Sequence, residues 1–173
     1  MYPVSEDSLF LAKYLTGYLK KIKNLKKDIK YLDMGTGSGI LSETASKFLK
    51  KENIFAADID KECVDFVKKK GFNCIQSNLF QKLRKGRFDI ITFNAPYLPE
   101  DKFDKKPDTT GGKLGDEASL KFIKQAKKYL SKGGVILLLI SSLTPFNRIK
   151  KFKPKIIARK KLFFEELIVL EIK

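Results

Sequence analysis

Hydrophobic residues recur along this chain with two different spacings. From residue 7 to residue 22 they return every three or four positions, which is the spacing of one helix face. Farther along, short and nearly continuous apolar runs predict buried strands at 29–34, 54–59, 72–75 and 88–94. Helical spacing returns between them, at 40–49 and in a segment that stops at Gly71. This alternation predicts an α/β fold, in which helices cover both faces of a parallel sheet.

The second half of the chain resumes this pattern after one irregular stretch. Prolines and glycines interrupt residues 98–115, which indicates a substrate loop or lid. A helix over 116–130, a strand over 135–140 and a short helix near 145–152 are predicted next. The final run, 163–172, is rich in β-forming residues, and we expect a hairpin there that completes the sheet.

The first predicted strand ends in a glycine-rich turn. Asp33 is followed by glycine at positions 35, 37 and 39, directly before helical spacing begins, so a ligand can lie against bare backbone. The spacing differs from the Gly-x-Gly-x-x-Gly of dinucleotide-binding folds, and the lysine of a phosphate-binding loop is missing. Because an acidic residue opens the loop, we expect a ligand that carries a cation or hydroxyl groups.

Polar side chains also follow the other predicted strands. Asp58, Asn78 and Asn94 lie at or just past the ends of the second, third and fourth strands, as Asp33 does for the first. Ligands of parallel sheets bind at the carboxyl ends of the strands. The four residues are therefore expected on one rim, and this joint placement is more specific than the glycine motif alone.

The charge of the chain has two possible explanations. Lysine and arginine number 36 against 20 acidic residues, for a net charge of +16 and a pI near 9.7. Such a balance favours an anionic partner such as nucleic acid. Alternatively, lysine is spread over nearly every helical face, as in a proteome where solubility or heat tolerance sets the composition. The densest basic segment is 148–161, with eight lysines and arginines.

Histidine is absent from the sequence, and Cys63 and Cys74 are its only cysteines. Zinc sites built from these residue types and histidine-based catalytic pairs are therefore excluded, and we predict no metal site. Both cysteines lie in apolar segments and are interpreted as small buried hydrophobes without a disulfide. Catalysis must then depend on positioning and electrostatics, or on a carboxylate.

The length favours one domain over residues 1–173, with residues 1–28 as a helical segment at its amino-terminal side. No apolar run reaches transmembrane length, and the start has no signal-peptide pattern. A cytoplasmic protein without a membrane partner is expected.

The motifs together resemble a known family. Asp33-x-Gly-x-Gly-x-Gly, an acidic residue at the end of the next strand, and Asn-x-Pro-Tyr at the end of the fourth are similar to class I methyltransferases that use S-adenosylmethionine and modify planar nitrogen. The opening Tyr-Pro-x-x-Glu-Asp-Ser and the Gly-Gly-x-x-Gly-x-Glu at 111–117 resemble the short archaeal and eukaryotic branch of HemK-type release-factor glutamine methyltransferases. The resemblance implies a Rossmann-like, mostly parallel seven-stranded sheet with a carboxy-terminal antiparallel hairpin.

The resemblance also implies a set of cofactor contacts. The methionyl part would meet Asp33 and the backbone of the glycine loop at Gly35 and Gly37, and its amino-acid end would meet Ser8. Asp58 would accept hydrogen bonds from the ribose hydroxyls, and Asn94 would also contact the cofactor. The adenine would lie between Leu79 and Asn78, a position where family members often have aspartate.

The reaction would take place at residues 94–97. Asn94 and the Ala95 carbonyl would accept hydrogen bonds from one NH2 group, which orients a poorly nucleophilic amide without a proton-abstracting base. Ala95 stands where the family usually has proline, but Pro96 still restricts its backbone. Tyr97 would form a wall of the flat substrate site.

Three functions follow from these observations. The first is methylation of the glutamine in the Gly-Gly-Gln motif of a class I peptide release factor, for which the resemblance also implies a small zinc-containing activator subunit. The second is methylation of exocyclic amino groups of adenine or guanine in RNA or DNA, with possible RNA contact through the basic tail. The third is a non-catalytic binding module, which the intact Asp33, Asp58 and Asn94 disfavour.

Overall fold

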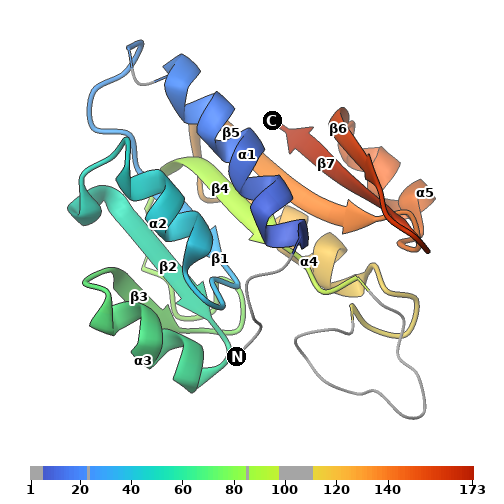
Figure 1. The fold of residues 1–173 in the computed structure, drawn as a ribbon, viewed down its shortest axis with the longest axis horizontal. Helices are drawn as coiled ribbons and strands as arrows, with labels where there is room; N and C mark the ends of the chain where they lie inside the picture. The colour runs from blue at the N-terminus through green and yellow to red at the C-terminus, as the bar shows by residue number, and fades with distance from the viewer. Residues whose placement is uncertain (1–5, 23, 85, 98–110) are drawn as a thin grey trace.

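A computed structural model describes residues 6–22, 24–84, 86–97 and 111–173, and contains one seven-stranded sheet in the order β3-β2-β1-β4-β5-β7-β6 (Figure 1). The first five strands are parallel, and β7 is antiparallel to both of its neighbours. The strands are β1 (Tyr31–Met34), β2 (Ile54–Asp58), β3 (Asn73–Gln76), β4 (Phe88–Asn94), β5 (Leu130–Ser141), β6 (Lys155–Lys161) and β7 (Glu166–Ile172). The predicted architecture, with its carboxy-terminal hairpin, is confirmed.

Helices cover both faces of this sheet, as the alternation of elements predicts. The helices are α1 (Glu6–Ile22), α2 (Ile40–Ser46), α3 (Lys61–Lys69), α4 (Glu117–Ala126) and α5 (Phe146–Ile149), with short 3-10 turns at η1 (Lys51–Asn53) and η2 (Lys150–Phe152). Alternate residues of each strand face opposite sides. Tyr31 therefore packs with α1, α2 and α3, whereas Leu32 packs with α4 and α5.

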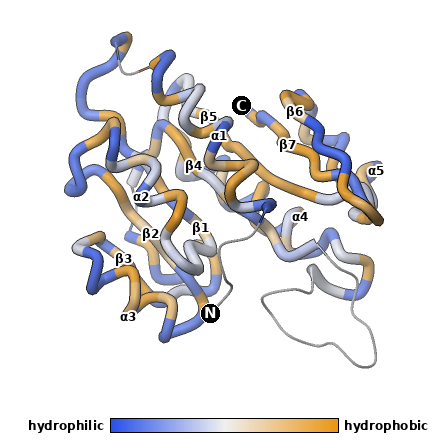
Figure 2. Tube along the Cα trace, in the orientation of Figure 1, coloured by the Kyte–Doolittle hydropathy of each residue, from blue (hydrophilic) through white to orange (hydrophobic). Residues whose placement is uncertain are grey.

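The centre of the sheet is almost entirely apolar. The six residues from Val135 to Ile140 in β5 are fully buried, because helices cover both of their faces. Figure 2 shows this run as a continuous hydrophobic tube between more hydrophilic surface segments. The resulting two-sided core fixes the position of β4, whose last residue lies at the rim where the candidate site is expected.

Two predicted boundaries in this region are wrong. The helix expected over 116–130 ends at Ala126, and the strand expected over 135–140 already begins at Leu130. The strand continues through Gly133 and Gly134 because a bulge in its pairing with β4 accommodates them. A Cβ atom on Gly134 would lie 2.9 Å from the Phe88 carbonyl oxygen, so glycine is required by close backbone approach.

The carboxy-terminal hairpin also differs in detail from the expectation. The apolar run predicted at 163–172 forms a strand only from Glu166 onward, and its partner β6 lies inside the basic segment 148–161. Phe163 and Phe164 lie in the turn between the two strands, where 92% and 87% of their surface is exposed. The β-forming composition of 163–172 therefore predicted β7, but it did not separate the strand from its turn.

The amino end of β4 is held by Asp89. Its side chain accepts hydrogen bonds from the Lys30 amide at 3.0 Å, from the Ser131 hydroxyl and from Lys26. Burial raises the pKa of Asp89, but the bonds from Lys26, Ser131 and Lys30 outweigh it, so the pKa lies below its usual value. Asp89 thus joins the starts of β1, β4 and β5.

We expect Asp89→Asn to lower the free energy of unfolding at pH 7 by about 1–3 kcal/mol, the usual effect of disrupting hydrogen bonds to a charged group. Because folding lowers this pKa, the carboxylate stabilises the protein above about pH 4, and the stabilisation is lost as the pH falls through the lowered value. Denaturant titrations at pH 7 and pH 3 measure the difference. Asp65→Asn, which removes a half-exposed carboxylate paired with Lys61 on the surface of α3, is the control. An equal effect of both variants would contradict this role of Asp89.

Candidate active site

The carboxyl ends of β1, β2 and β4 bring the predicted polar residues to one edge of the sheet. Asp33 lies next to the end of β1, and Asp58 and Asn94 are the last residues of β2 and β4. The three strands are adjacent and parallel, with β1 in the middle. Asn78 follows β3 by two residues. The structure therefore places all four side chains along the same rim, as their positions in the sequence predict.

Asp33 is the most deeply buried acid of this rim. Its Oδ2 accepts hydrogen bonds from the Thr36 hydroxyl at 2.8 Å, the Ser42 hydroxyl at 2.8 Å and the Ser42 amide at 3.1 Å. Its Oδ1 is also buried but has no partner within the described part of the chain. Burial raises the pKa of Asp33 to about 6, although the bonds from Ser42 and Thr36 oppose the shift. One oxygen thus holds the loop, and the other can accept one more donor.

The glycines after Asp33 follow a path that other residues rarely adopt. Gly35, Gly37 and Gly39 have φ values of 63°, 52° and 81°. At Gly35 a Cβ atom would also lie 2.8 Å from the Phe93 ring. The Gly35 amide donates to the Ala57 carbonyl at 2.8 Å, which anchors the loop to β2. The loop therefore presents bare backbone beside the two acidic side chains.

Asp58 connects this loop to the second strand. Its Oδ2 accepts a hydrogen bond from the Gly37 amide at 2.8 Å, and its Oδ1 accepts one from the Asp60 amide at 2.9 Å. Burial raises the pKa of Asp58, and these backbone bonds lower it in part. Each carboxylate oxygen keeps a second acceptor position, so the side chain can bind hydroxyl donors while holding the loop.

Asn78 and Leu79 lie beside this acidic pair, beyond β3. Asn78 is exposed, whereas Leu79 is half-buried and has a positive φ of 51°. The Ser77 hydroxyl fixes the turn, because it donates to the Leu79 carbonyl at 2.7 Å and accepts from the Lys82 amide at 3.0 Å. Sequence reasoning missed Ser77, although a serine just after a strand is a typical turn-forming residue.

Asn94 is held by a residue from the first helix. Its Nδ2 donates to the Ser8 hydroxyl at 3.3 Å, and its Oδ1 is buried without a partner among the described residues. Ser8, which the sequence assigned to the cofactor, therefore lies against the end of β4. The bond directs the amide nitrogen of Asn94 toward α1 and leaves its carbonyl oxygen available for another donor.

A glycine turn packs against residues 95–97. A Cβ atom on Gly111 would lie 2.6 Å from the Pro96 carbonyl oxygen and 2.4 Å from the Gly115 carbonyl oxygen, so no larger residue fits. Ala95 is buried, and Tyr97 is half-buried against the core that contains α1. The loop or lid predicted at 98–115 lies mostly outside the described residues; its last part, 111–115, forms this turn.

An ion pair that sequence reasoning missed anchors the same turn. Asp116 is fully buried, and the guanidinium of Arg148 in α5 lies 2.9 Å from its carboxylate. Burial raises the pKa of Asp116, while Arg148 lowers it. Glu117, the first residue of α4, accepts a hydrogen bond from the Leu114 amide at 3.1 Å. A single acid before a helix gives no sequence signal for a buried partner 32 residues away.

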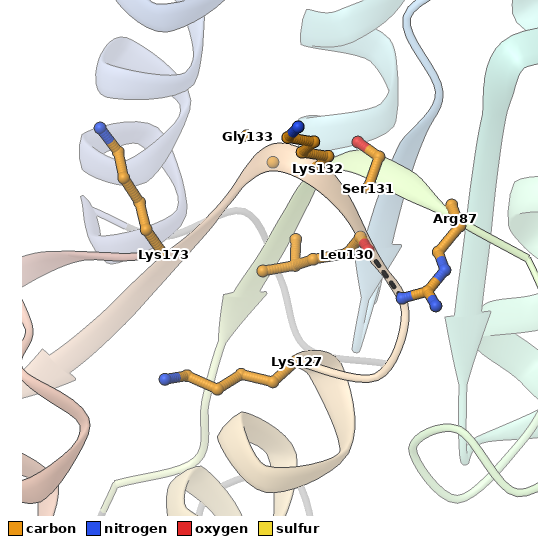
Figure 3. A pocket seen from close by; sticks show the side chains of 8 residues that line it. Arg87, Lys127, Leu130, Ser131, Lys132, Gly133 and Lys173 are labelled. Atoms are coloured by element: carbon orange, nitrogen blue, oxygen red, sulfur yellow. Dashed lines mark hydrogen bonds between the residues drawn. The ribbon is translucent and has the colours of Figure 1, made fainter.

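A cavity of about 620 Å³ lies at the opposite end of the sheet, where β5 begins (Figure 3). Its lining includes four basic side chains, from Arg87, Lys127, Lys132 and Lys173. Arg87 is engaged with the Leu130 carbonyl at 3.0 Å, and Lys127 and Lys173 extend to the other side of Leu130. Because these cations do not converge, the cavity is not a competing candidate for the active site.

Within the described ranges, no three metal-binding side chains cluster, and no helix is both long and apolar enough to cross a membrane. Cys63 and Cys74 are buried free thiols, as predicted, and burial raises the pKa of both to about 12. Among the described residues, the acidic rim and residues 94–97 therefore form the candidate site.

Comparison with known proteins agrees with this geometry. The family profile described as methyltransferase small domain matches residues 14–163. A relative from Methanocaldococcus jannaschii, provisionally named a protein N5-glutamine methyltransferase, is 37% identical over 188 residues, 98% of this chain and 90% of that protein. A release factor glutamine methyltransferase from Rhodopirellula baltica is 28% identical over 131 residues, 65% of this chain and 44% of that protein.

Solved structures share the fold. The 16S rRNA N2-G1207 methyltransferase of T. thermophilus, solved with S-adenosylmethionine and guanosine, has a TM-score of 0.66 and 20% identity, over 99% of this chain and 44% of that one. A ribosomal protein L11 methylase from Lactobacillus delbrueckii has a TM-score of 0.65 and 19% identity, over 94% of this chain and 77% of that one. Because the family profile and the M. jannaschii relative both extend over most of the sequence, the chain belongs to the methyltransferase small-domain family of class I S-adenosylmethionine-dependent methyltransferases.

Proposed function

We propose that this chain transfers a methyl group from S-adenosylmethionine to the glutamine side-chain amide in the Gly-Gly-Gln motif of a class I peptide release factor. The observation that carries the proposal is the orientation of Asn94, whose buried Oδ1 is left free while Ser8 accepts from its Nδ2. The M. jannaschii relative, which matches almost the whole chain, supports a glutamine substrate.

The acidic rim fits the methyl donor. Asp33 Oδ1 is a buried acceptor without a described partner, which suits the positively charged amino group of the methionyl part. Gly35 and Gly37 leave room for close backbone approach, and Asp58 can accept bonds from the ribose hydroxyls. Leu79 offers an apolar surface for the adenine, and Asn78 an amide for its edge. When bound, the donor supplies an activated methyl group on a sulfonium.

The substrate amide is positioned by residues 94–97. One N–H of the glutamine NH2 group donates to Asn94 Oδ1 and the other to the Ala95 carbonyl, which directs the nitrogen toward the methyl group. The N–CH3 bond forms as the sulfur–methyl bond breaks, and the nitrogen then loses one proton to water. Pro96 and Tyr97 bound the flat site. Ser8 acts as a positioning residue, because it fixes which end of the Asn94 amide faces the substrate.

Exocyclic amino groups of adenine or guanine in RNA or DNA are the second candidate substrate. They are also planar NH2 groups with two N–H donors, so the same acceptors suit them. The net charge of +16 and the basic segment 148–161 favour this alternative and an RNA contact through the tail. Labelled donor, offered with purified release factor and with bulk RNA, distinguishes the two by which of them becomes labelled.

A small zinc-containing activator subunit is part of the same proposal. Three large apolar residues are exposed near this edge of the sheet: Ile75 on the edge strand β3, Phe66 on the adjacent α3, and Ile59 in the connection between β2 and α3. Isolated apolar residues are common on surfaces, but three on neighbouring elements beside an open sheet edge suit a protein partner. This surface lies beside the proposed cofactor site, at the end of β2.

We expect Asn94→Ala to reduce methyl transfer to purified release factor by about 10²–10³-fold, the usual effect of removing one positioned acceptor or donor from an active site. The cofactor should still bind in calorimetry, with an affinity that falls far less than the rate of transfer. Gln125→Ala on α4 is the control and should retain activity. Undiminished transfer by the Asn94 variant, with cofactor still bound, would contradict the amide-orienting role.

Loss of the Asp58 carboxylate should weaken cofactor binding. Asp58→Ala removes charge-assisted hydrogen bonds worth about 1.5–3 kcal/mol, which corresponds to roughly a 10- to 150-fold higher Kd. Asp58→Asn keeps the shape of the side chain and part of the Gly37 contact. Its Kd for the cofactor should therefore lie between those of the wild type and Asp58→Ala. Calorimetry gives the Kd, and circular dichroism checks that each variant is folded. Equal affinities would refute the ribose assignment.

The affinity for the cofactor should fall below about pH 6. The pKa of Asp33 is raised to about 6, so the side chain becomes neutral below that pH and loses its attraction for a cation. Well below pH 6, Kd should rise by about tenfold for each unit by which the pH falls. At pH 6, cofactor binding should release protons, because the Asp33 carboxyl groups that are still protonated ionise when the cation binds. Calorimetry between pH 5 and pH 8 measures both effects. Asp33→Asn should show weak binding without this pH dependence, and a wild-type profile flat through pH 6 would exclude the contact.

A further inference from the structure

Phe163 and Phe164 form the most exposed apolar feature of the described chain. Their ring centroids lie 4.7 Å apart at an angle of 82°, and 92% and 87% of their surfaces are exposed. Neither ring contributes to the core. An exposed aromatic pair costs solubility without stabilising the fold, so it indicates a binding partner.

The sheet register places this pair on the active-site edge. Asn94 pairs with Leu139 in β5, and two residues farther along β5, Ser141 pairs with Leu167 at the start of β7. The β6–β7 turn that carries both rings therefore projects from the same edge as Asn94. Three strand spacings separate β4 from β6, which is about 14 Å across the sheet. A chain-like ligand bound at this turn can reach toward the rim.

The neighbouring strand β6 is strongly basic. Arg159 and Lys160 pair with Glu166 and Glu6, whereas Lys155 and Lys161 form no salt bridge with described residues. Lysines on an edge strand also prevent unwanted pairing with another sheet, and they repel a second copy of this strand. That role does not explain the two rings. Figure 2 shows the hydrophilic end of β6 leading directly into the hydrophobic turn.

We propose that Phe163 and Phe164, together with the lysines of β6, bind single-stranded RNA beside the active-site rim. Surfaces for single-stranded nucleic acid combine a basic track for the phosphates with aromatic rings on which bases stack. The cores of protein–protein interfaces, in contrast, are depleted of lysine. The contact is independent of the methylated group, and it accounts for part of the basic charge.

Binding of a labelled 12-nucleotide single-stranded RNA, followed by fluorescence anisotropy without donor or release factor, tests this inference. The variant Phe163→Ser/Phe164→Ser should bind at least about tenfold more weakly, because each stacked base contributes substantially. Both rings are exposed, so the variant should fold normally. Leu25→Ser, which removes another exposed apolar residue, is the control and should bind as the wild type does.

The charge contribution is measured separately. Lys155→Ser/Lys161→Ser should reduce the slope of log affinity against log salt by about 1.4, or roughly 0.7 for each lost phosphate contact. The matched control Lys20→Ser/Lys21→Ser removes two lysines at the end of α1. If both double variants reduce the salt slope equally, the RNA is attracted by the overall charge of the protein and not by the lysines of β6. That result would overturn the proposed site.

Two further results would also overturn it. If the phenylalanine variant binds RNA normally but loses methyl transfer to release factor, the turn docks a protein. If it changes the sedimentation mass of the purified chain, the turn mediates self-association. Because RNA binding is measured without methyl transfer, failure of this inference is distinct from failure of the proposed function.

Discussion

The buried carboxylate of Asp33 is the constraint on which the candidate site depends. An acid at the end of a central strand is costly to bury, and this one is stabilised by three hydrogen bonds from the loop and helix that follow it. Those bonds draw the glycine turn over the strand end, where Gly37 reaches Asp58. The Asp33 carboxylate therefore shapes the loop, while one of its oxygens has no partner among the described residues.

A second set of contacts assembles the reaction end of the site from distant parts of the chain. Ser8 and Asn94 are 86 residues apart, and Arg148 reaches back to Asp116 beneath the turn that packs against Pro96. The two halves meet where β1 and β4 lie side by side. The proposed methyl-donor site and the proposed substrate site are thus built on adjacent strands, which limits their relative motion.

Much of this arrangement could be predicted from the sequence, because local signals carry it. Strand ends, glycine spacing and the Asn-Ala-Pro-Tyr segment each depend on a few neighbouring residues, and they placed Asp33, Asp58 and Asn94 correctly. The Asp116–Arg148 pair, the role of Asp89 and the start of β7 could not be predicted, since they depend on partners far away in the chain. Phe163 and Phe164 show the same limit. Phenylalanine is typical of strands, but the pairing of β6 with β7 ends before these two residues and leaves them in the turn.

The position of β7 has a consequence for how the protein is made. The last strand of the chain lies between β5 and β6 rather than at the edge. During synthesis the parallel half can form while β5 remains an open apolar edge, and that edge closes only when residues near 172 have left the ribosome. The apolar edge of β5 is thus exposed from its own synthesis until β7 has emerged, and the lysine-rich β6, which emerges between them, cannot cover it because β6 pairs only with β7.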